Sequence, residues 1–521
     1  MFKFDPIELE VFKNIFVSIS EEMGAVLGRT SLSPNIKERK DFSCALFNQK
    51  GETFAQGSHI PVHLGAMPLS VQASLKTIHF KKGDLVILND PYKGGTHLPD
   101  ITCISPVFVD KKLVFFVANR AHHSDVGGMT PGSMPLATEI FQEGLIIPPL
   151  KIIQKGKLNK ALLNMILANV RTPEERKGDL LAQIAANNKG KERLEEIIKK
   201  YGLKKILLYS KIIQDYTEKI LRDSIKAIPD GIYTFSDYMD DDGINDSPVK
   251  IGVKININND EAIIDFSSSS SQVAGGINAN FAVTCSAVLY VFRCLVMEDI
   301  PFNTGLMRPL KIEAPPGSIV NAQFPAATAG GNVETSQRIA DVLLGALSKA
   351  IPEKIPAASS GTMNNITFGG FDPVRNTNFA YYETIGGGMG ASFFNPGLSG
   401  VHTNMTNSLN TPLEALENYL PLRIKKYSLR RGSGGDGQKK GGEGIIREYE
   451  FFVPTQVTIM SERRKFAPYG IQGGKSGKKG QNILFSKGKK ILLSSKINLK
   501  VSPGDVLRIE TPGGGGYGRK K

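Results

Sequence analysis

The residues best suited to chemistry follow an HxxD…H pattern between positions 97 and 122. His97 stands three residues before Asp100, and His122 follows further along the chain. Two apolar runs rich in β-branched residues, Ile101–Val109 and Leu113–Ala118, flank a turn-like Asp-Lys-Lys and predict an antiparallel hairpin. Pairing around that turn places Asp100 beside His122, with His97 at the same open end. Two imidazoles and a carboxylate there predict a site for one divalent metal, Zn²⁺, Mn²⁺ or Fe²⁺, with positions left for water and substrate.

The distribution of histidines supports this prediction. Of the seven histidines, six fall within the first 123 residues. Three of them, His59, His63 and His79, are each interpreted more simply as polar residues that bond to protein groups. Successive strand residues point to opposite faces, so His122 and its neighbour His123 cannot both reach one metal from a regular strand. The hairpin register favours His122 as the ligand.

Composition limits the class of protein. A chain of 521 residues predicts two to four subdomains, and its 41% hydrophobic content is ordinary for a globular protein. No apolar run reaches the length of a membrane helix, and the acidic, amphipathic N-terminus does not resemble a signal peptide. The four cysteines form no CxxC pair, which predicts a reduced, cytoplasmic protein. They are Cys44, Cys103, Cys285 and Cys294.

The net charge of +14 suggests nucleic acid as a possible partner. The lysines, however, occur mostly as scattered pairs, without an interleaved aromatic surface, a helix-turn-helix or a zinc finger. We therefore predict no nucleic-acid partner.

Local patterns predict an α+β protein of several subdomains. Asp5-Pro6 opens an amphipathic helix to about Val26, and Thr172–Ala227 reads as a helical hairpin broken near Gly202. Shorter elements are strands at 41–47, 84–89, 232–239, 249–256 and 262–266, and helices near 69–78, at 280–297 and from about 333. We expect a metal-site region at 1–165, the helical hairpin at 166–228, a mixed central region at 229–422 and a β-rich C-terminal domain at 423–521.

Two glycine-rich segments resemble nucleotide-binding loops only superficially. Gly470–Ser476 is one residue short of the GxxxxGK[ST] spacing, and no helix is predicted to follow it. Gly386–Gly390 follows an apolar strand, but the Asn395-Pro396-Gly397 turn comes too soon for a dinucleotide-binding helix. Both are interpreted as turns, and the chain is predicted to have no nucleotide site of its own.

Several segments together resemble the hydantoinase B family, which includes the C-terminal half of ATP-dependent 5-oxoprolinase and, more distantly, the large subunit of acetone carboxylase. The matching segments span nearly the whole chain. They are DFSCALF at 41–47, NDP at 89–91, GGTHLPD at 94–100, HHSDVGG at 122–128, EIFQEGLIIPP at 139–149, GGNVETSQR at 330–338 and TPGGGGYG at 511–518. The family's metal-binding pattern falls on His97, Asp100 and His122, and Asp41 is a further candidate ligand.

This resemblance implies one half of a two-component enzyme. A hydantoinase A-like subunit with an actin-like ATPase fold would use ATP to phosphorylate the amide carbonyl oxygen of a lactam or hydantoin. The present chain would then open the activated ring with water, which a divalent metal activates near neutral pH. We expect a hetero-oligomer with two copies of each subunit. The substrate could be 5-oxoproline, a hydantoin or a larger lactam.

Two other functions remain open at this point. One is a carboxylase subunit that joins a phosphorylated ketone enolate to carbon dioxide, although carboxylase relatives tend to be longer and to need an additional small subunit. The other is a non-catalytic scaffold, against which the intact HxxD…H pattern argues.

Ring opening also needs a proton for the leaving nitrogen, and four titratable residues follow the hairpin. They are His123, Asp125, Glu139 and Glu143. We favour His123 as the proton shuttle because it adjoins a predicted ligand and its ordinary pKa lies near neutrality. Alternatively, the two glutamates cap or pair other groups.

A phosphorylated intermediate needs cationic partners, and guanidinium groups suit phosphate well. The densest basic cluster contains Arg463 and Arg464, while Arg338 follows a Gly-Gly-Asn turn where a helix start would add N–H donors. The alternative is that Arg463 and Arg464 form surface ion pairs or contact the partner protein.

Overall fold

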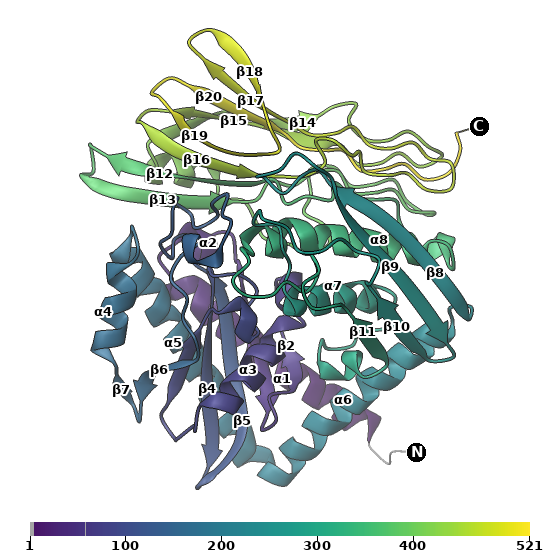
Figure 1. Ribbon diagram of the computed structural model, residues 1–521. Coiled ribbons are helices and arrows are strands. Elements are labelled where there is room, and N and C mark those ends of the chain that lie inside the picture. The colour runs from purple at the N-terminus through teal and green to yellow at the C-terminus, as the bar shows by residue number, and fades with distance from the viewer. Residues whose placement is uncertain (1–4, 58, 521) are drawn as a thin grey trace.

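The computed structural model describes residues 5–57 and 59–520 and has the mixed α+β architecture predicted from the sequence. Figure 1 shows an upper β layer, formed late in the chain, above two α+β regions that lie side by side. No helix in the described ranges is both long and apolar enough to cross a bilayer. The first four residues of the segment compared with a signal peptide lie outside the described residues.

One of the two lower regions is built on a seven-stranded sheet in the order β2-β1-β5-β4-β3-β6-β7. Its strands are β1 (Phe42–Asn48), β2 (Thr53–Gln56), β3 (Leu85–Leu88), β4 (Asp100–Val109), β5 (Lys112–His122), β6 (Leu150–Gln154) and β7 (Lys157–Leu158). The predicted strands at 41–47 and 84–89 are confirmed as β1 and β3. The predicted hairpin strands, β4 and β5, occupy the centre of the sheet and are almost entirely buried.

The hairpin has the predicted register, with Asp100 opposite His122. Its turn is shorter than predicted, because Lys112 already belongs to β5 and a bulge at Val114 of β5 absorbs the extra residue. Asp110 in the turn has φ +54°, the left-handed conformation that tight hairpin turns require. β5 also continues past the predicted end at Ala118. Pairing with both β4 and β1 supports these added residues.

Helices cover this sheet and connect it to the rest of the molecule. α1 (Pro6–Thr30) begins as predicted, with the Asp5 carboxylate accepting from the Ile7 N–H, and ends four residues beyond Val26. The others are α2 (Pro34–Lys37), α3 (Ala66–Thr77), α4 (Lys160–Ala168), α5 (Pro173–Tyr201) and α6 (Leu203–Lys226). The predicted break at Gly202 separates α5 from α6. α6 contributes to the apolar clusters of both lower regions and so links them.

The second lower region contains a four-stranded sheet in the order β11-β10-β9-β8. Its strands are β8 (Gly231–Met239), β9 (Val249–Asn258), β10 (Glu261–Asp265) and β11 (Leu310–Glu313), and its helices are α7 (Phe281–Cys294) and α8 (Ser336–Leu347). α7 ends three residues before the predicted Met297. The helix expected from about Val333 begins with a π-helical turn, Gly331–Thr335, that leads into α8.

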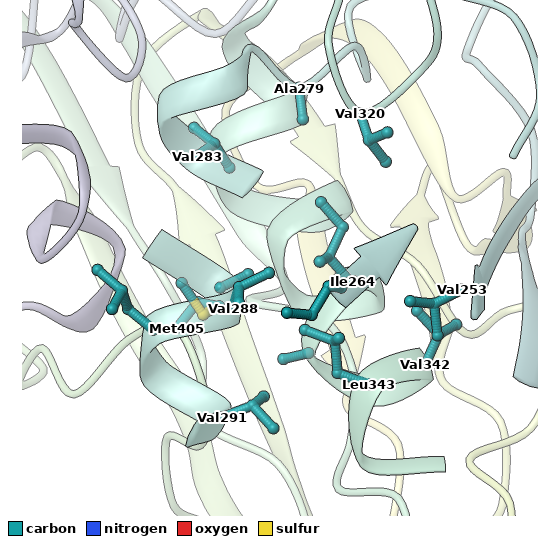
Figure 2. Packing of buried hydrophobic residues seen from close by; sticks show 14 of the residues in the cluster. Val253, Ile264, Ala279, Val283, Val288, Val291, Val320, Val342, Leu343 and Met405 are labelled. Atoms are coloured by element: carbon teal, nitrogen blue, oxygen red, sulfur yellow. The ribbon is translucent and has the colours of Figure 1, made fainter. Parts of the chain in front are cut away.

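The core of this region brings together distant parts of the chain (Figure 2). Val288 and Val291 of α7 lie in one buried cluster with Ile264 of β10, Leu343 of α8 and Met405 from a later loop. The same cluster includes the apolar residues that line the candidate site described below.

The upper layer consists of two sheets that share one apolar cluster. The first is β13-β12-β16-β19, with β12 (Asn365–Asp372), β13 (Thr377–Glu383), β16 (Thr455–Met460) and β19 (Lys496–Val501). The second is β14-β15-β20-β17-β18, with β14 (Leu422–Arg430), β15 (Gly444–Phe451), β17 (Gln481–Ser486), β18 (Lys489–Leu493) and β20 (Val506–Glu510); α9 (Leu413–Tyr419) precedes it. The first sheet takes strands from both sides of position 422. The subdomain boundaries remain a prediction.

Glycine-rich loops pack backbone against backbone at one end of the upper layer. The N–H of Gly442 donates to Met389 O (2.8 Å), and that of Gly514 donates to Gly442 O (2.9 Å). A Cβ on Gly514 would lie 2.1 Å from Met389 O, so only glycine permits this approach. Neither Gly386–Gly390 nor Gly470–Ser476 leads into a helix in the described chain.

Candidate metal centre

Three buried side chains converge where the hairpin opens. Asp100 begins β4, His122 ends β5, and His97 lies in the loop before β4. The distances His97 Nε2–Asp100 Oδ1, His122 Nδ1–Asp100 Oδ1 and His97 Nε2–His122 Nδ1 are each 3.2 Å. Ligand atoms about 2.1 Å from a tetrahedral metal lie about 3.4 Å apart. The three donor atoms therefore have the spacing and chemistry of a metal site.

Other groups hold these side chains in place. His97 Nδ1 lies 3.3 Å from the carbonyl oxygen of Ala329, which favours the tautomer whose Nε2 lone pair faces Asp100 and His122. Thr96 Oγ1 donates to Asp100 Oδ2 at 2.5 Å. Such bonds around a ligand fix its orientation before a metal binds.

Asp41 lies beside the same cluster. It immediately precedes β1, and its backbone oxygen accepts from the N–H of His122 at 3.0 Å. Its side chain lines a cavity together with Asp100 and His122. The predicted additional ligand is thus on the cavity wall, but its carboxylate is not among the donor atoms that converge within 4.8 Å of one another.

Charge and burial affect these groups in different ways. Burial alone would lower the pKa of His97, but the nearby Asp100 carboxylate outweighs it and the net pKa is raised. Burial would raise the pKa of Asp100, yet His97 and His63 hold it well below its usual range. For His122, burial is the largest effect and lowers the pKa. An ionised carboxylate beside a neutral imidazole is the protonation state that metal binding requires.

His63 also reaches the cluster, although the sequence suggested only a satisfied polar residue. Its Nε2 lies 3.3 Å from Asp100 Oδ2, and its Nδ1 lies 2.9 Å from Ser43 Oγ. The ring therefore bonds to protein groups, as expected, but one of those groups is a predicted ligand. The dense group of N-terminal histidines was the available sequence signal. His59, by contrast, accepts from the Cys44 N–H, and His79 is exposed.

The cavity next to the cluster is small, and apolar and polar side chains both line it away from the ligands. The volume that the centre of a water molecule can occupy in it is about 20 Å³. Ile60, Val62, Val333, Met363 and Met405 form its apolar wall. Polar groups enter it from Asn332, Tyr382, Thr384 and Thr406. The Tyr382 ring stacks on His122 at 4.4 Å between centroids, and His122 Nε2 has no hydrogen-bond partner among the described residues.

The predicted acid–base residues of the segment after the hairpin face elsewhere. His123 Nε2 lies 3.0 Å from Gln183 Oε1 on α5, and burial, helped by Arg176, lowers the pKa of His123 to about 4. Asp125 accepts from the N–H of Gly127 (3.0 Å) and from Arg171 Nη1 (3.0 Å), which organises the following turn. Neither side chain lines the cavity beside the metal cluster.

The two predicted glutamates differ from each other. Glu139 is exposed and forms a capping box with Gln142, in agreement with the structural alternative. Glu143 is buried, and its Oε1 accepts from the N–H groups of Thr328 (2.7 Å) and Ala329 (2.8 Å). Burial raises the pKa of Glu143 to about 7. Glu143 thus holds the segment whose Ala329 carbonyl orients His97.

Of the predicted phosphate-binding arginines, Arg338 and Arg463 are fully buried and Arg464 is half-buried. Arg463 pairs with Asp237 Oδ2 (2.8 Å) and Asp341 Oδ2 (2.5 Å), and Arg338 Nη1 pairs with the same Asp237 oxygen (2.9 Å). Arg464 donates to Asn364 Oδ1 (2.7 Å) and Asn482 Oδ1 (2.8 Å). The surface-pair alternative is therefore wrong for Arg463, which is fully buried, whereas the half-buried Arg464 bonds to neutral oxygens. A contact of these arginines with the partner protein stays a prediction. Protein acceptors already hold all three guanidinium groups, so the geometry does not support a phosphate site among them.

The geometry and the whole-chain pattern lead to a family assignment. The model of the Hydantoinase B/oxoprolinase family matches residues 5–520, and the chain belongs to this family.

Three proteins similar to this chain carry different names. An uncharacterised protein of Methanocaldococcus jannaschii is 45% identical, with 99% of this chain and 91% of that protein covered. 5-Oxoprolinase 1 of Arabidopsis thaliana is 42% identical over 99% of this chain, which spans only 42% of the plant protein. The B component of a putative D-/L-hydantoinase of Pseudomonas sp. is 32% identical, with 99% and 90% covered.

Solved structures share the fold. An ATP-dependent caprolactamase from Pseudomonas jessenii superimposes with a TM-score of 0.92 at 28% identity, covering 99% of this chain and 92% of that one. Acetone carboxylase in its nucleotide-free form superimposes with a TM-score of 0.91 at 18% identity, covering 99% and 76%. The second likeness shows the fold alone.

Proposed function

We propose that this chain is the metal-dependent hydrolytic subunit of a two-component, ATP-dependent cyclic amidase. The observation that carries the proposal is the convergence of His97, Asp100 and His122 beside a cavity. The plant relative named 5-oxoprolinase, the Pseudomonas hydantoinase component and the fold shared with a caprolactamase support a lactam or hydantoin as substrate.

In this proposal the three convergent residues hold one Zn²⁺, Mn²⁺ or Fe²⁺, with Asp41 as a further ligand. When bound, such an ion polarises a carbonyl oxygen and lowers the pKa of water toward neutrality. Thr96 and His63 hold the Asp100 carboxylate, and the Ala329 carbonyl holds His97. The apolar cavity wall keeps bulk water away from the reacting amide.

The partner is a hydantoinase A-like ATPase. Phosphorylation of the amide carbonyl oxygen by ATP makes an unreactive amide electrophilic, and this chain then opens the ring. The Pseudomonas relative carries the name of one component of a hydantoinase, which supports a divided enzyme, and the longer plant relative has room for a second part in one chain. We propose a cytoplasmic hetero-oligomer with two copies of each subunit.

Reconstitution tests this proposal. The chain, co-purified with a hydantoinase A-like subunit, is incubated with ATP and a panel of 5-oxoproline, hydantoins and larger lactams. We expect ring-opened amino acid without a bicarbonate requirement, and neither ATP hydrolysis nor ring opening by this chain alone. A bicarbonate-dependent keto acid from a ketone would instead establish the carboxylase alternative.

Metal analysis of the purified chain separates an enzyme from a scaffold. One divalent ion per chain is expected, and its identity follows from elemental analysis. A chain without metal after expression in metal-supplemented medium, combined with an inactive complex, would favour the scaffold.

A further inference from the structure

A buried arginine lies behind the part of the cavity wall formed by Tyr382 and Thr384. Arg39 is fully buried. Its guanidinium donates to Leu409 O (3.2 Å), Tyr382 O (2.8 Å), Thr384 Oγ1 (2.8 Å) and Ser408 Oγ (3.2 Å), all of which are neutral oxygens. Buried Arg463 and Arg447, by contrast, each contact a carboxylate directly. A buried guanidinium without a carboxylate in contact is costly unless another anion approaches it.

Hydroxyl groups connect Arg39 to the cavity. Thr384 and Thr406 line the cavity, and Ser408 lies between them, with its Oγ 3.1 Å from each of their oxygens. Because Arg39 donates to Thr384 and Ser408, the protons of these hydroxyls point away from the guanidinium. Two hydrogen bonds join the hydroxyls of Thr384, Ser408 and Thr406, so one of the three protons is left for a further acceptor, either His402 Nε2 or a group in the cavity.

The remaining titratable neighbour of this wall adds no charge. His402 Nε2 lies 3.5 Å from Thr384 Oγ1, and burial together with Arg39 lowers the pKa of His402 to about 3. His402 is therefore neutral at physiological pH. Arg39 is the positive charge in contact with Thr384, whereas Asp41 and Asp100, which also line the cavity, contribute negative charge.

We propose that Thr384 and Thr406, polarised by Arg39, form a binding site for an anionic oxygen group on the ligand of this cavity. The inference rests on the proposed function and specifies its substrate: a small cyclic amide with its carbonyl toward the metal ligands and its anion toward the hydroxyls. The apolar residues between the two ends, including Ile60 and Met363, contact the ring carbons. The cavity has room for about one water molecule, so binding of a ring requires its flexible methionine side chains to move.

The anionic group has two chemical sources. It is either a carboxylate carried by the ring or the phosphate placed on the carbonyl oxygen during activation. Three probes separate them: 5-oxoproline, which carries a ring carboxylate; 2-pyrrolidinone, which is the same ring without it; and inorganic phosphate.

Calorimetric titration of the full, metal-loaded chain measures the binding of each probe without relying on turnover. If a carboxylate is bound, the wild type binds 5-oxoproline at least about tenfold more tightly than 2-pyrrolidinone, as expected for hydrogen bonds to a charged group. Thr406→Val removes this preference and leaves the Kd of 2-pyrrolidinone unchanged. If the site instead takes the phosphate of the activated intermediate, the wild type binds inorganic phosphate and Thr406→Val does not. Equal affinities for the two rings combined with no phosphate binding, or selectivity retained in Thr406→Val, overturns the proposal.

Matched variants keep this test interpretable. Thr406→Val leaves every hydrogen bond of Arg39 intact, whereas Thr384→Val removes one, and Thr384→Ser restores the hydroxyl and should restore the selectivity. Thr367→Val is the control, because this buried threonine lies outside the cavity and its hydroxyl has no partner within the described residues. It should bind all probes as the wild type does. The chain could bind phosphate only when the hydroxyl is present and yet bind neither ring. That result would support the anion site and count against the lactam function.

Discussion

Two buried clusters of this molecule each combine carboxylates with nitrogen-bearing side chains. They differ in how the charges are matched. In the metal cluster, the donor atoms of His97, Asp100 and His122 point at one another across 3.2 Å and border a cavity. In the arginine cluster, Arg338 and Arg463 pair with protein carboxylates. Lone pairs that converge need a ligand, whereas opposite charges in contact satisfy each other. The comparison distinguishes a candidate ligand site from a structural cluster.

Glu334 lies between the two clusters. Its Oε1 accepts from Asn365 Nδ2 (2.6 Å), and Asn365 Oδ1 accepts from the hydroxyl of Tyr382 (2.9 Å), which stacks on His122. Burial, followed by the negative charge of Glu462 in the arginine cluster, raises the pKa of Glu334 to about 8. A neutral Glu334 therefore connects the two clusters at physiological pH.

Removing a metal ligand should have the largest effect. His97→Ala or His122→Ala is expected to lose the bound ion and to reduce ring opening by at least about 100-fold, because hydroxide is no longer available near neutral pH. Elemental analysis and turnover of the complex measure the two effects, and a circular dichroism spectrum shows that the fold survives. His79→Ala, an exposed histidine, is the control. Full metal occupancy in both ligand variants would refute the site.

Breaking the arginine cluster should affect stability more than chemistry. Arg463→Ala leaves Asp237 and Asp341 without this partner, and loss of a buried ion-pair partner typically costs about 3–5 kcal/mol. Urea unfolding measures the loss. Arg375→Ala, which removes a half-exposed partner of Asp372, is the control and should cost far less. If Arg463→Ala were as stable as the wild type but hydrolysed ATP in the complex without ring opening, the phosphate role predicted from sequence would be restored.

Glu334→Gln should change how stability depends on pH. The folded-state pKa of about 8 lies above the ordinary value of 4.5, so the folded wild type binds the extra proton and loses stability as pH rises between these values. The loss from pH 5 to pH 8 is on the order of 3 kcal/mol. Glutamine stays neutral, so the variant should become the more stable protein at pH 8, as measured by urea unfolding at both pH values. Parallel pH curves for the two proteins would contradict this.

The smallest effect is expected at His123. The ring bonds to Gln183 on α5, away from the cavity, and its pKa of about 4 keeps it neutral above pH 5. His123→Asn should therefore retain the metal and most of the rate, with an unchanged pH profile between pH 6 and pH 9. If the variant's rate no longer fell at low or at high pH as the wild-type rate does, His123 would be established as the proton shuttle predicted from sequence.

Much of the metal cluster could be predicted from the chain alone. The apolar runs and the turn between them specify the hairpin register, because a slip of one residue would exchange the side chains that face the two sides of the sheet. That register puts Asp100 opposite His122, and the short spacing from His97 follows from the chain itself. The N-cap at Asp5 and the helix break at Gly202 are equally local, and both were predicted.

The sequence by itself determined features encoded over short stretches: most of the helices, the hairpin register and the HxxD…H pattern. Only the tertiary structure decided which distant groups meet them. It brought His63 to Asp100, set Arg39 behind Thr384, and buried Arg463 against Asp341. Local periodicity reports which face of an element is buried, but it does not report which distant partner covers that face. A charged residue becomes a structural pair or an open site through that long-range contact.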